Sequence, residues 1–127
     1  MSPAEISVLL VDDDEMIRAC IGDYLGDEGF ILHVASSGEE ALRVIAGISP
    51  VVCITDLRLS GMNGEEFIEQ AHAICPETGY LLHTGMDYTL SDDLRAIGMT
   101  SDDVFLKPIL DLSLLVKRIM LIASAEK

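Results

Sequence analysis

Short apolar runs recur along the chain, separated by stretches in which apolar and polar residues mix. Runs that are apolar at nearly every position favour strands that are buried on both faces, which are typical of parallel sheets. The first, third and fifth runs are the most continuous. The predicted strands cover residues 6–11, 30–35, 50–55, 79–83 and 103–106.

Apolar residues at helical spacing occupy the segments between these runs. From Met16 to Leu25 they recur every three or four positions, and Gly29 provides a natural stop. Ser36 and Glu39 form the pattern of a capping box at the start of a second helix. The remaining predicted helices begin near Asn63 with Glu66 as a capping partner, run from about Leu90 to Ile97, and run from about Leu110 to Ala123.

The regular alternation of strand and helix predicts an α/β fold, a doubly wound parallel sheet with helices on both faces. The 127 residues are near the commonest size of a single domain. The chain contains no internal repeat, low-complexity segment or linker. We therefore expect one domain over residues 1–127, with a five-stranded sheet flanked by five helices.

The acidic composition of the chain limits the kinds of molecule that it is expected to bind. A net charge of −14 disfavours direct binding to nucleic acid, because phosphates would be repelled, and suits a metal ion or a basic patch on a protein. No segment is long enough to span a bilayer or has the pattern of a signal peptide, so we expect a cytoplasmic domain without membrane contact. Cys20, Cys53 and Cys75 are expected to be small core residues in a reducing compartment.

Four of the predicted strands end in residues that are suited to phosphate chemistry. Taken singly, each has a simpler interpretation as a helix cap, a turn residue, a strand residue or a surface lysine. The carboxyl ends of parallel strands share one edge of the sheet, where ligands bind in doubly wound folds, so we expect the residues to converge. They are Asp12 and Asp13 after the first strand, Asp56 after the third, Thr84 after the fourth and Lys107 after the fifth.

Asp12, Asp13 and Asp56 would form a cluster of like charges, which is unstable unless it is protonated or bridged by a cation. Oxygen-only ligands suit Mg²⁺, with Mn²⁺ as a substitute. A carboxylate beside such an ion is a suitable nucleophile toward phosphorus. The hydroxyl of Thr84 and the ammonium of Lys107 are suited to contact phosphoryl oxygens.

The segments around these residues resemble the receiver domain of two-component response regulators. Residues 8–14 resemble the opening strand and acidic pair of that family, and residues 56–64 resemble the loop around its phosphorylated aspartate. Thr84-Gly85 and Lys107-Pro108 match its two remaining signatures. The resemblance extends from about Ile6 to Ile122 and therefore covers almost the whole chain.

The resemblance implies a flavodoxin-like sheet with strand order 2-1-3-4-5. It implies that Asp56 accepts a phosphoryl group from a phosphohistidine on a sensor histidine kinase or a histidine phosphotransfer protein, and that Thr84 and Lys107 contact that group. Two copies of such domains often pair through the last two helices. The metal ligands implied by the resemblance are Asp12, Asp13, Asp56 and the backbone carbonyl of Arg58.

The chain departs from the family pattern at two positions. Ser60 stands where the family usually has proline, and we expect this change to loosen the loop. Val104 stands where the family usually has an aromatic residue, and Phe105 should lie on the opposite face of the strand. We therefore expect signalling to run through residues 85–89 and the helix that follows them.

Bulky residues lie two positions after the predicted acceptor and after Thr84, namely Arg58 and Met86. Side chains at these positions can flank a phosphoryl group and obstruct the hydrolytic water. We therefore expect a long-lived phosphoaspartate. His83, which precedes Thr84, is expected to be a hydrogen-bonded core histidine.

Two other functions fit parts of the sequence. A binding module with the same fold that signals without phosphate would account for Ser60 and Val104, although every residue of the phosphoacceptor site is present. An aspartyl-phosphate hydrolase could use residues 12–14 as its nucleophile motif, although the chain leaves little room for a substrate-selecting cap. In the leading interpretation the domain catalyses its own phosphorylation and dephosphorylation and acts mainly in signalling.

Overall fold

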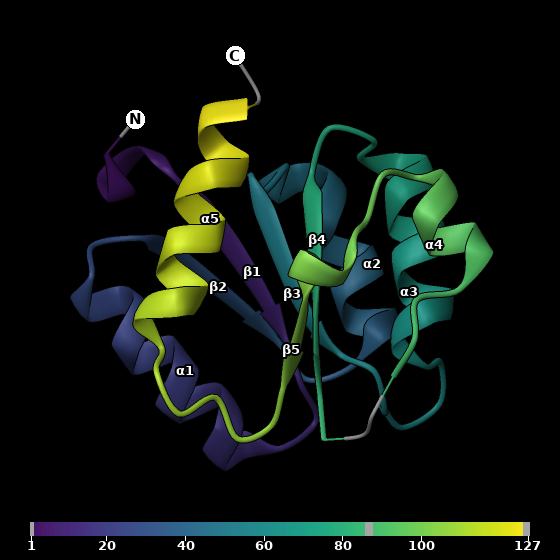
Figure 1. Ribbon diagram of the computed structural model, residues 1–127, viewed down its shortest axis with the longest axis horizontal. Helices are drawn as coiled ribbons and strands as arrows, with labels where there is room; N and C mark the ends of the chain where they lie inside the picture. Colours follow the sequence, from purple (N-terminus) through teal and green to yellow (C-terminus); the bar gives the residue numbers. More distant parts are fainter. Residues whose placement is uncertain (1, 86–87, 126–127) are drawn as a thin grey trace.

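The computed structural model describes residues 2–85 and 88–125, and a parallel sheet forms its centre (Figure 1). The strands lie in the order β2-β1-β3-β4-β5, and all neighbouring pairs are parallel. This confirms the predicted α/β class, the doubly wound sheet and its strand order. The strands are β1 (Ser7–Val11), β2 (Ile31–Ala35), β3 (Val52–Asp56), β4 (Gly79–Thr84) and β5 (Val104–Leu106).

Helices connect the strands and cover both faces of the sheet. They are α1 (Glu15–Asp27), α2 (Gly38–Ile48), α3 (Gly64–Ile74), α4 (Asp92–Ala96) and α5 (Ser113–Ala125). In Figure 1, α1 and α5 lie on one side of the sheet, and α2, α3 and α4 lie on the other. Within the described residues, no helix is both long enough and apolar enough to cross a bilayer. The fourth helix is shorter than the predicted segment 90–97.

Side chains that alternate along the strands form two apolar layers. Leu10, Ile54 and Leu81 belong to the layer on the side of α1 and α5, where they pack with Leu25 and Leu115. The opposite layer joins the sheet to α2, α3 and α4. It includes Leu9, Val11, Ile45, Phe67, Leu82 and Leu94.

The start of α2 lies one residue later than predicted. Ser37, not Ser36, caps the helix, because the Ser37 Oγ accepts a hydrogen bond from the Glu40 N–H at 3.0 Å. The Glu40 carboxylate in turn accepts from the Ser36 N–H at 2.9 Å. Glu39, the predicted partner of Ser36, instead accepts from the Met62 N–H in the loop after β3.

The predicted cap of α3 is confirmed, and the last helix begins later than predicted. Asn63 caps α3 as predicted: its side chain accepts from the Glu66 N–H at 2.9 Å, and Glu66 accepts from the Asn63 N–H at 3.3 Å. The last helix begins at Ser113 and not at Leu110. The reason is that the Asp111 carboxylate accepts from the Ser113 N–H at 3.0 Å, which starts the helix there.

The cysteines are unpaired, and they differ in burial. Cys53 is buried in β3, as predicted, and Cys75 is half-buried at the end of α3. Cys20 is exposed on α1, so the prediction that it is a core residue is wrong. The helical pattern left its side undecided because Cys20 lies at the edge of the apolar stripe, between Ile17 and Ile21.

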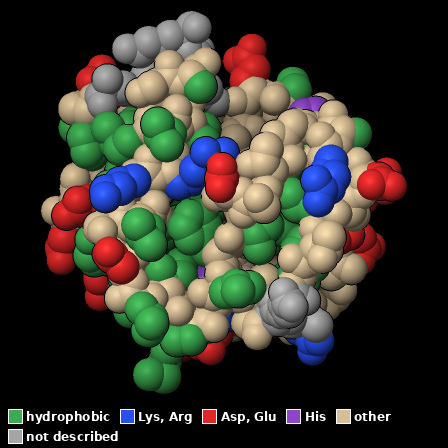
Figure 2. Space-filling model, viewed as in Figure 1, with side chains coloured by type: hydrophobic (Ala, Val, Ile, Leu, Met, Phe, Trp, Pro, Cys, Tyr) green, Lys and Arg blue, Asp and Glu red, His purple; other side chains and the backbone are tan. Residues whose placement is uncertain are grey.

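Exposed hydrophobic side chains gather on one part of the surface. Figure 2 shows them over α5, α1 and the segment that joins β5 to α5. Leu110 is the most exposed of these, at 93%, and it precedes α5. The others on these elements include Met16, Leu114 and Leu121.

Gly64 lets the first turn of α3 lie directly against the end of β3. A Cβ at this position would lie 2.4 Å from the carbonyl oxygen of Asp56 and 2.8 Å from the Cα of Leu57. The Gly64 N–H donates to the Leu57 carbonyl at 2.8 Å. A side chain would therefore push this turn away from the predicted acceptor.

We predict that Gly64→Ala lowers the free energy of unfolding by about 1 to 3 kcal/mol, because the added methyl group overpacks the backbone. Gly47→Ala is the control, since a Cβ there meets nothing within 4 Å inside α2. It should raise the free energy of unfolding by about 0.5 to 1 kcal/mol through helix propensity. Urea denaturation measures both, and similar changes in the two variants would contradict the prediction.

Candidate functional site

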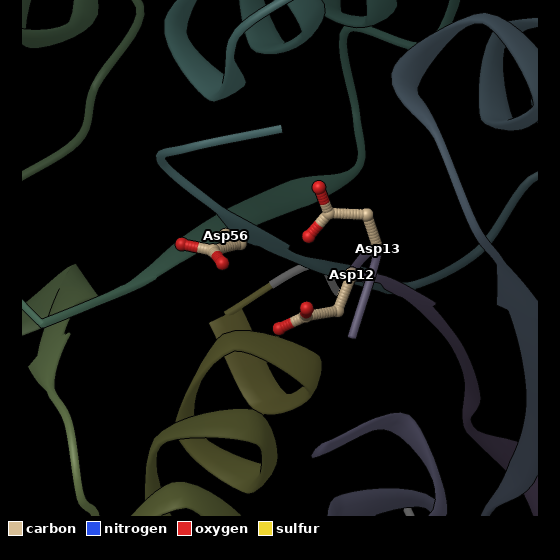
Figure 3. Close-up of side chains that lie close together, drawn as sticks. All are labelled: Asp12, Asp13 and Asp56. Atoms are coloured by element: carbon tan, nitrogen blue, oxygen red, sulfur yellow. The ribbon is translucent and has the colours of Figure 1, made fainter. Parts of the chain in front are cut away.

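The residues predicted to share a site come together at the carboxyl ends of the strands. The strand order reverses between β1 and β3, which is where doubly wound sheets bind ligands. Asp12 and Asp13 follow β1, and Asp56 ends β3. Figure 3 shows these side chains around a common space. One carboxylate oxygen from each lies within 4.8 Å of the others.

The carboxylates of this cluster differ in exposure. Asp12 is 1% exposed and Asp56 is 7% exposed, whereas Asp13 is exposed to solvent. Burial raises the pKa of Asp12, and the nearby charges of Asp56 and Asp13 act in the same direction. The amide of Asp14 and the ammonium of Lys107 partly offset this shift. Holding the carboxylates together therefore carries an electrostatic cost.

Lys107 supplies the positive charge of the site. Its Nζ donates to the Asp56 Oδ2 at 2.8 Å and lies 3.7 Å from the Asp12 Oδ2. Burial alone would lower the pKa of Lys107, but its contacts with Asp56 and Asp12 raise that pKa above its usual value. The ammonium therefore remains charged at neutral pH and balances part of the acidic cluster. The Lys107–Pro108 peptide bond is cis.

Backbone groups fix the carboxylate of Asp56. The Arg58 N–H donates to the Asp56 Oδ1 at 3.2 Å, while Lys107 binds the other oxygen. The Thr55 hydroxyl donates to the Asp56 carbonyl at 3.0 Å, at the point where β3 ends. Arg58 thus lies in the loop next to the cluster, as predicted, and its own N–H already contacts Asp56.

Thr84 is buried at the end of β4. Its carbonyl oxygen accepts from the Lys107 N–H at 2.7 Å, which joins the ends of β4 and β5. Strand alternation places Thr84 on the same face as Leu82, which packs toward α2, α3 and α4. Asp56 shares the opposite face with Ile54, which packs toward α1 and α5. Asp56 and Thr84 therefore belong to different faces at one edge of the sheet.

The first turn of α1 is built on the acidic loop. Asp14 caps this helix: its carboxylate accepts from the N–H groups of Met16 and Ile17 at 2.9 and 3.3 Å. Its own N–H donates to the Asp12 Oδ1 at 2.9 Å. Arg18, one turn later, donates to the Asp12 carbonyl at 2.6 Å. Asp14 is thus a structural residue that orients the buried member of the cluster.

Contacts between distant segments at this site were not predicted from the sequence. The Ser60 N–H and hydroxyl both donate to the Asp13 Oδ2, at 3.2 and 3.0 Å. Glu39 accepts from the Met62 N–H at 3.3 Å. The loop after β3 is therefore tied to two other segments, contrary to the expectation that Ser60 loosens it. No local pattern signals these contacts, because the partners lie 47 and 23 residues apart.

His83 is buried at the edge of the site, and the prediction of a fully hydrogen-bonded core histidine is wrong. Its Nε2 has no hydrogen-bond partner among the described residues. It lines a cleft of about 200 Å³ with Lys107 and apolar residues that include Ile17, Ile21 and Ile109. Burial lowers the pKa of His83 to about 4, and the charge of Lys107 adds to this effect.

The fifth strand agrees with the prediction made from its sequence. Val104 packs with the core on the side of α2, α3 and α4, and Phe105 packs with the core on the opposite side. A cleft of about 290 Å³ lies beside Val104, and Tyr88 is among the residues that line it. The Tyr88 hydroxyl donates to a carboxylate oxygen of Glu65 on α3. Met86, for which a role was also predicted, lies outside the described residues.

The donor set of the cluster fits a hard divalent cation. Asp12, Asp13 and Asp56 each offer a carboxylate oxygen, which is the type of ligand that Mg²⁺ and Mn²⁺ prefer. The positive charge of a cation would offset the repulsion that the buried carboxylates experience. The arrangement thus places the Asp56 carboxylate beside two other carboxylates and the ammonium of Lys107.

Comparison with known proteins gives a family match. The model of the response regulator receiver domain matches residues 8–120. The chain is 27% identical over 106 residues to the Regulator of RpoS from Escherichia coli, covering 84% of this chain and 31% of that protein. It is 31% identical over 104 residues to a cyclic di-GMP phosphodiesterase from Thermotoga maritima, covering 82% of this chain and 27% of that protein. The chain thus spans about a third or less of these curated relatives.

Solved structures give the same result for the fold. The chemotaxis protein CheY4 from Vibrio cholerae is 27% identical, with a TM-score of 0.78 and coverage of 92% of this chain and 98% of that chain. A CheY-like response regulator receiver domain protein from Methanospirillum hungatei is also 27% identical, with a TM-score of 0.80. That match covers 95% of this chain and 96% of the other.

The buried imidazole should make stability depend on pH. Below the ordinary pKa of 6.5, the unfolded chain binds a proton at His83 that the folded chain binds only near pH 4. The free energy of unfolding should therefore fall by roughly 2 to 3 kcal/mol as pH drops through this window. Urea denaturation of the metal-free domain, compared with His83→Leu, measures the effect. The variant should lose less stability over the same window, and identical slopes would contradict the assignment.

Proposed function

Because the chain belongs to the family of response regulator receiver domains, we propose that it is a phosphoacceptor switch whose acceptor is Asp56. One observation carries this proposal. At the ends of separate strands, the Asp56 carboxylate lies beside Asp12 and Asp13 and accepts a hydrogen bond from Lys107. A nucleophile, a cation site and a charge that can bind phosphoryl oxygens thus occupy one edge of the sheet. We further propose that residues 1–127 are a single receiver domain.

In the proposed reaction, a carboxylate oxygen of Asp56 attacks the phosphorus of a phosphohistidine. The phosphorus–nitrogen bond breaks, and the imidazole leaves with the bonding electron pair once its other nitrogen carries a proton. The product is an acyl phosphate on Asp56 and a free histidine on the partner. The hydrogen bond from the Arg58 N–H orients the attacking carboxylate in this reaction.

We propose that Asp12, Asp13, Asp56 and the Arg58 carbonyl hold Mg²⁺, with Mn²⁺ as a substitute. Bound Mg²⁺ would neutralise charge that accumulates between the carboxylates and the phosphoryl oxygens. The oxygen-only donor set and the raised pKa of Asp12 support this assignment, because both favour an added cation.

Lys107 and Thr84 are the proposed contacts of the phosphoryl group. The Lys107 ammonium is already hydrogen-bonded to Asp56, so it can pair with a phosphoryl oxygen once the carboxylate has become an acyl phosphate. Thr84 is linked to Lys107 through the backbone hydrogen bond between their strands. We propose that its hydroxyl donates to a phosphoryl oxygen and that signalling continues through residues 85–89 and α4.

The proposed partner is a sensor histidine kinase or a histidine phosphotransfer protein in the cytoplasm. The net charge of −14 favours a partner with a basic surface and disfavours direct contact with nucleic acid. Met16 and Leu110 are exposed, and they neighbour in sequence Ile17 and Ile109, which line the cleft beside Lys107. A helical partner at this cleft could bury them. A homodimer through α4 and α5 is also proposed, since Leu114 and Leu121 are exposed on α5.

The competing hydrolase interpretation loses support at Asp14. That function would use residues 12–14 as a nucleophile motif, but the Asp14 carboxylate caps α1. Lys107 lies nearer to Asp56, at 2.8 Å, than to Asp12, at 3.7 Å. We therefore favour signalling through Asp56 over turnover of an external phosphate ester.

We expect purified protein to incorporate label from radiolabelled acetyl phosphate only when Mg²⁺ is present. Asp56→Asn should reduce this label to background, because the amide is a poor nucleophile toward phosphorus. Asp23→Asn, on the exposed side of α1, is the matched control and should label like the wild type. Full labelling of Asp56→Asn would exclude the proposed acceptor, and labelling without Mg²⁺ would exclude the metal requirement.

We expect the phosphoaspartate to be long-lived and Arg58→Ala to shorten its lifetime several-fold. Arg58 lies two residues after the acceptor, and its side chain can keep the hydrolytic water from the phosphorus. The measurement is the rate of label loss from the purified phosphoprotein in Mg²⁺ buffer. Arg43→Ala, at an exposed position of α2, is the control and should leave the rate unchanged. An unchanged rate in Arg58→Ala would contradict the shielding role.

A further inference from the structure

We propose that Ser60 is a positioning residue for Mg²⁺, which it serves by holding the Asp13 carboxylate in place beside Asp12 and Asp56. This inference rests on the proposed function, in which these carboxylates bind the metal. It concerns a residue that stands where the family usually has proline. The evidence is the pair of hydrogen bonds from Ser60 to Asp13 and the difference in exposure among the carboxylates.

Both donors of Ser60 end on the same oxygen atom. Its N–H lies 3.2 Å, and its hydroxyl 3.0 Å, from the Asp13 Oδ2. These bonds use one carboxylate oxygen and do not engage Oδ1, and a carboxylate has lone pairs for several partners. Ser60 can therefore hold the Asp13 side chain while that side chain also binds a cation.

Asp13 is the member of the cluster that most needs such a contact. Asp12 is buried and is fixed by the Asp14 N–H, and Asp56 is buried and is fixed by Lys107. Asp13 is exposed, so without a partner its side chain would exchange among rotamers. Fixing it before the cation arrives removes an ordering cost from metal binding.

The backbone half of this contact exists only because residue 60 is not proline, which has no N–H to donate. The loop is held on its other side as well, because the Met62 N–H donates to Glu39 on α2. Between these contacts, Gly61 adopts a φ of +79°, a backbone conformation that favours glycine. Ser60 therefore presents its donors to Asp13 from a loop with defined geometry.

Hydrogen bonds to a carboxylate also withdraw negative charge, which by itself would weaken its attraction for a cation. In metal sites the orienting effect dominates: loss of a group that holds a ligand typically weakens metal binding by about 10- to 100-fold. We therefore expect the loss of Ser60 to weaken Mg²⁺ binding.

The test is a titration of the unphosphorylated domain with Mg²⁺ alone, followed by isothermal calorimetry or amide chemical shifts. Ser60→Ala, which keeps the N–H, should weaken binding by about ten-fold, equivalent to about 1.4 kcal/mol. Ser60→Pro, which removes both donors, should weaken it by roughly 10- to 100-fold. Ser60→Thr keeps both donors and should bind Mg²⁺ like the wild type.

Ser113→Ala is the matched control. The Ser113 N–H and hydroxyl also donate to a single carboxylate oxygen, that of Asp111, but at the start of α5. This variant should leave Mg²⁺ affinity unchanged. Urea denaturation without Mg²⁺ identifies any Ser60 variant that fails to fold. If Ser60→Pro fails to fold, the Mg²⁺ affinity of Ser60→Ala still decides the test.

Affinities of Ser60→Ala and Ser60→Pro equal to or tighter than that of the wild type would overturn the positioning role. That result would leave the phosphoacceptor proposal intact, because labelling of Asp56 at saturating Mg²⁺ tests it separately. Failure of the wild type itself to bind Mg²⁺ would instead overturn the proposed metal site.

Discussion

Repulsion among carboxylates is the constraint on which the rest of this site depends. Two unit charges about 5 Å apart repel by on the order of 3 kcal/mol at the effective dielectric constant of a protein surface. The parallel pairing of β1 with β3 nevertheless holds Asp12 beside Asp56. Lys107 offsets part of the repulsion. The pKa of Asp12 is raised mainly by burial, and the charges of Asp56 and Asp13 add to that shift. A cation bound among these carboxylates, as proposed above, would reduce this repulsion.

The strands and the composition of the site follow from the sequence because both depend on local patterns. A buried parallel strand must be apolar along its length, and its last residue lies at the edge where ligands bind. The polar residues that end such runs are Asp12, Asp56, Thr84 and Lys107, and they are the residues that meet at this edge. Helix starts are less well determined. Adjacent serines and glutamates offer two registers for the cap of α2, and only packing selects Ser37.

Features that depend on contacts between distant segments could not be predicted in this way. The family resemblance indicates that Ser60 stands where proline is usual, but the sequence does not show that the Ser60 N–H donates to Asp13. The same limit applies to His83, whose Nε2 lacks a partner among the described residues because of how β4, α1 and the segment after β5 pack. The prediction for Cys20 was wrong for a related reason, since this residue lies at the edge of a helical stripe. Tertiary packing determines the contact of Ser60, the surroundings of His83 and the exposure of Cys20.

Residues of the site lie on both faces of the sheet. Asp56 shares a face with the core beneath α1 and α5, while Thr84 and Val104 share the face covered by α2, α3 and α4. Tyr88, in the segment after Thr84, is fastened to α3 on that second side. The sheet therefore separates Asp56 from the side chains that pack around Val104 and Tyr88. If the proposed phosphodonor binds over α1, the surface of α3 and α4 on the other side of the sheet stays accessible, so a second protein can bind there at the same time.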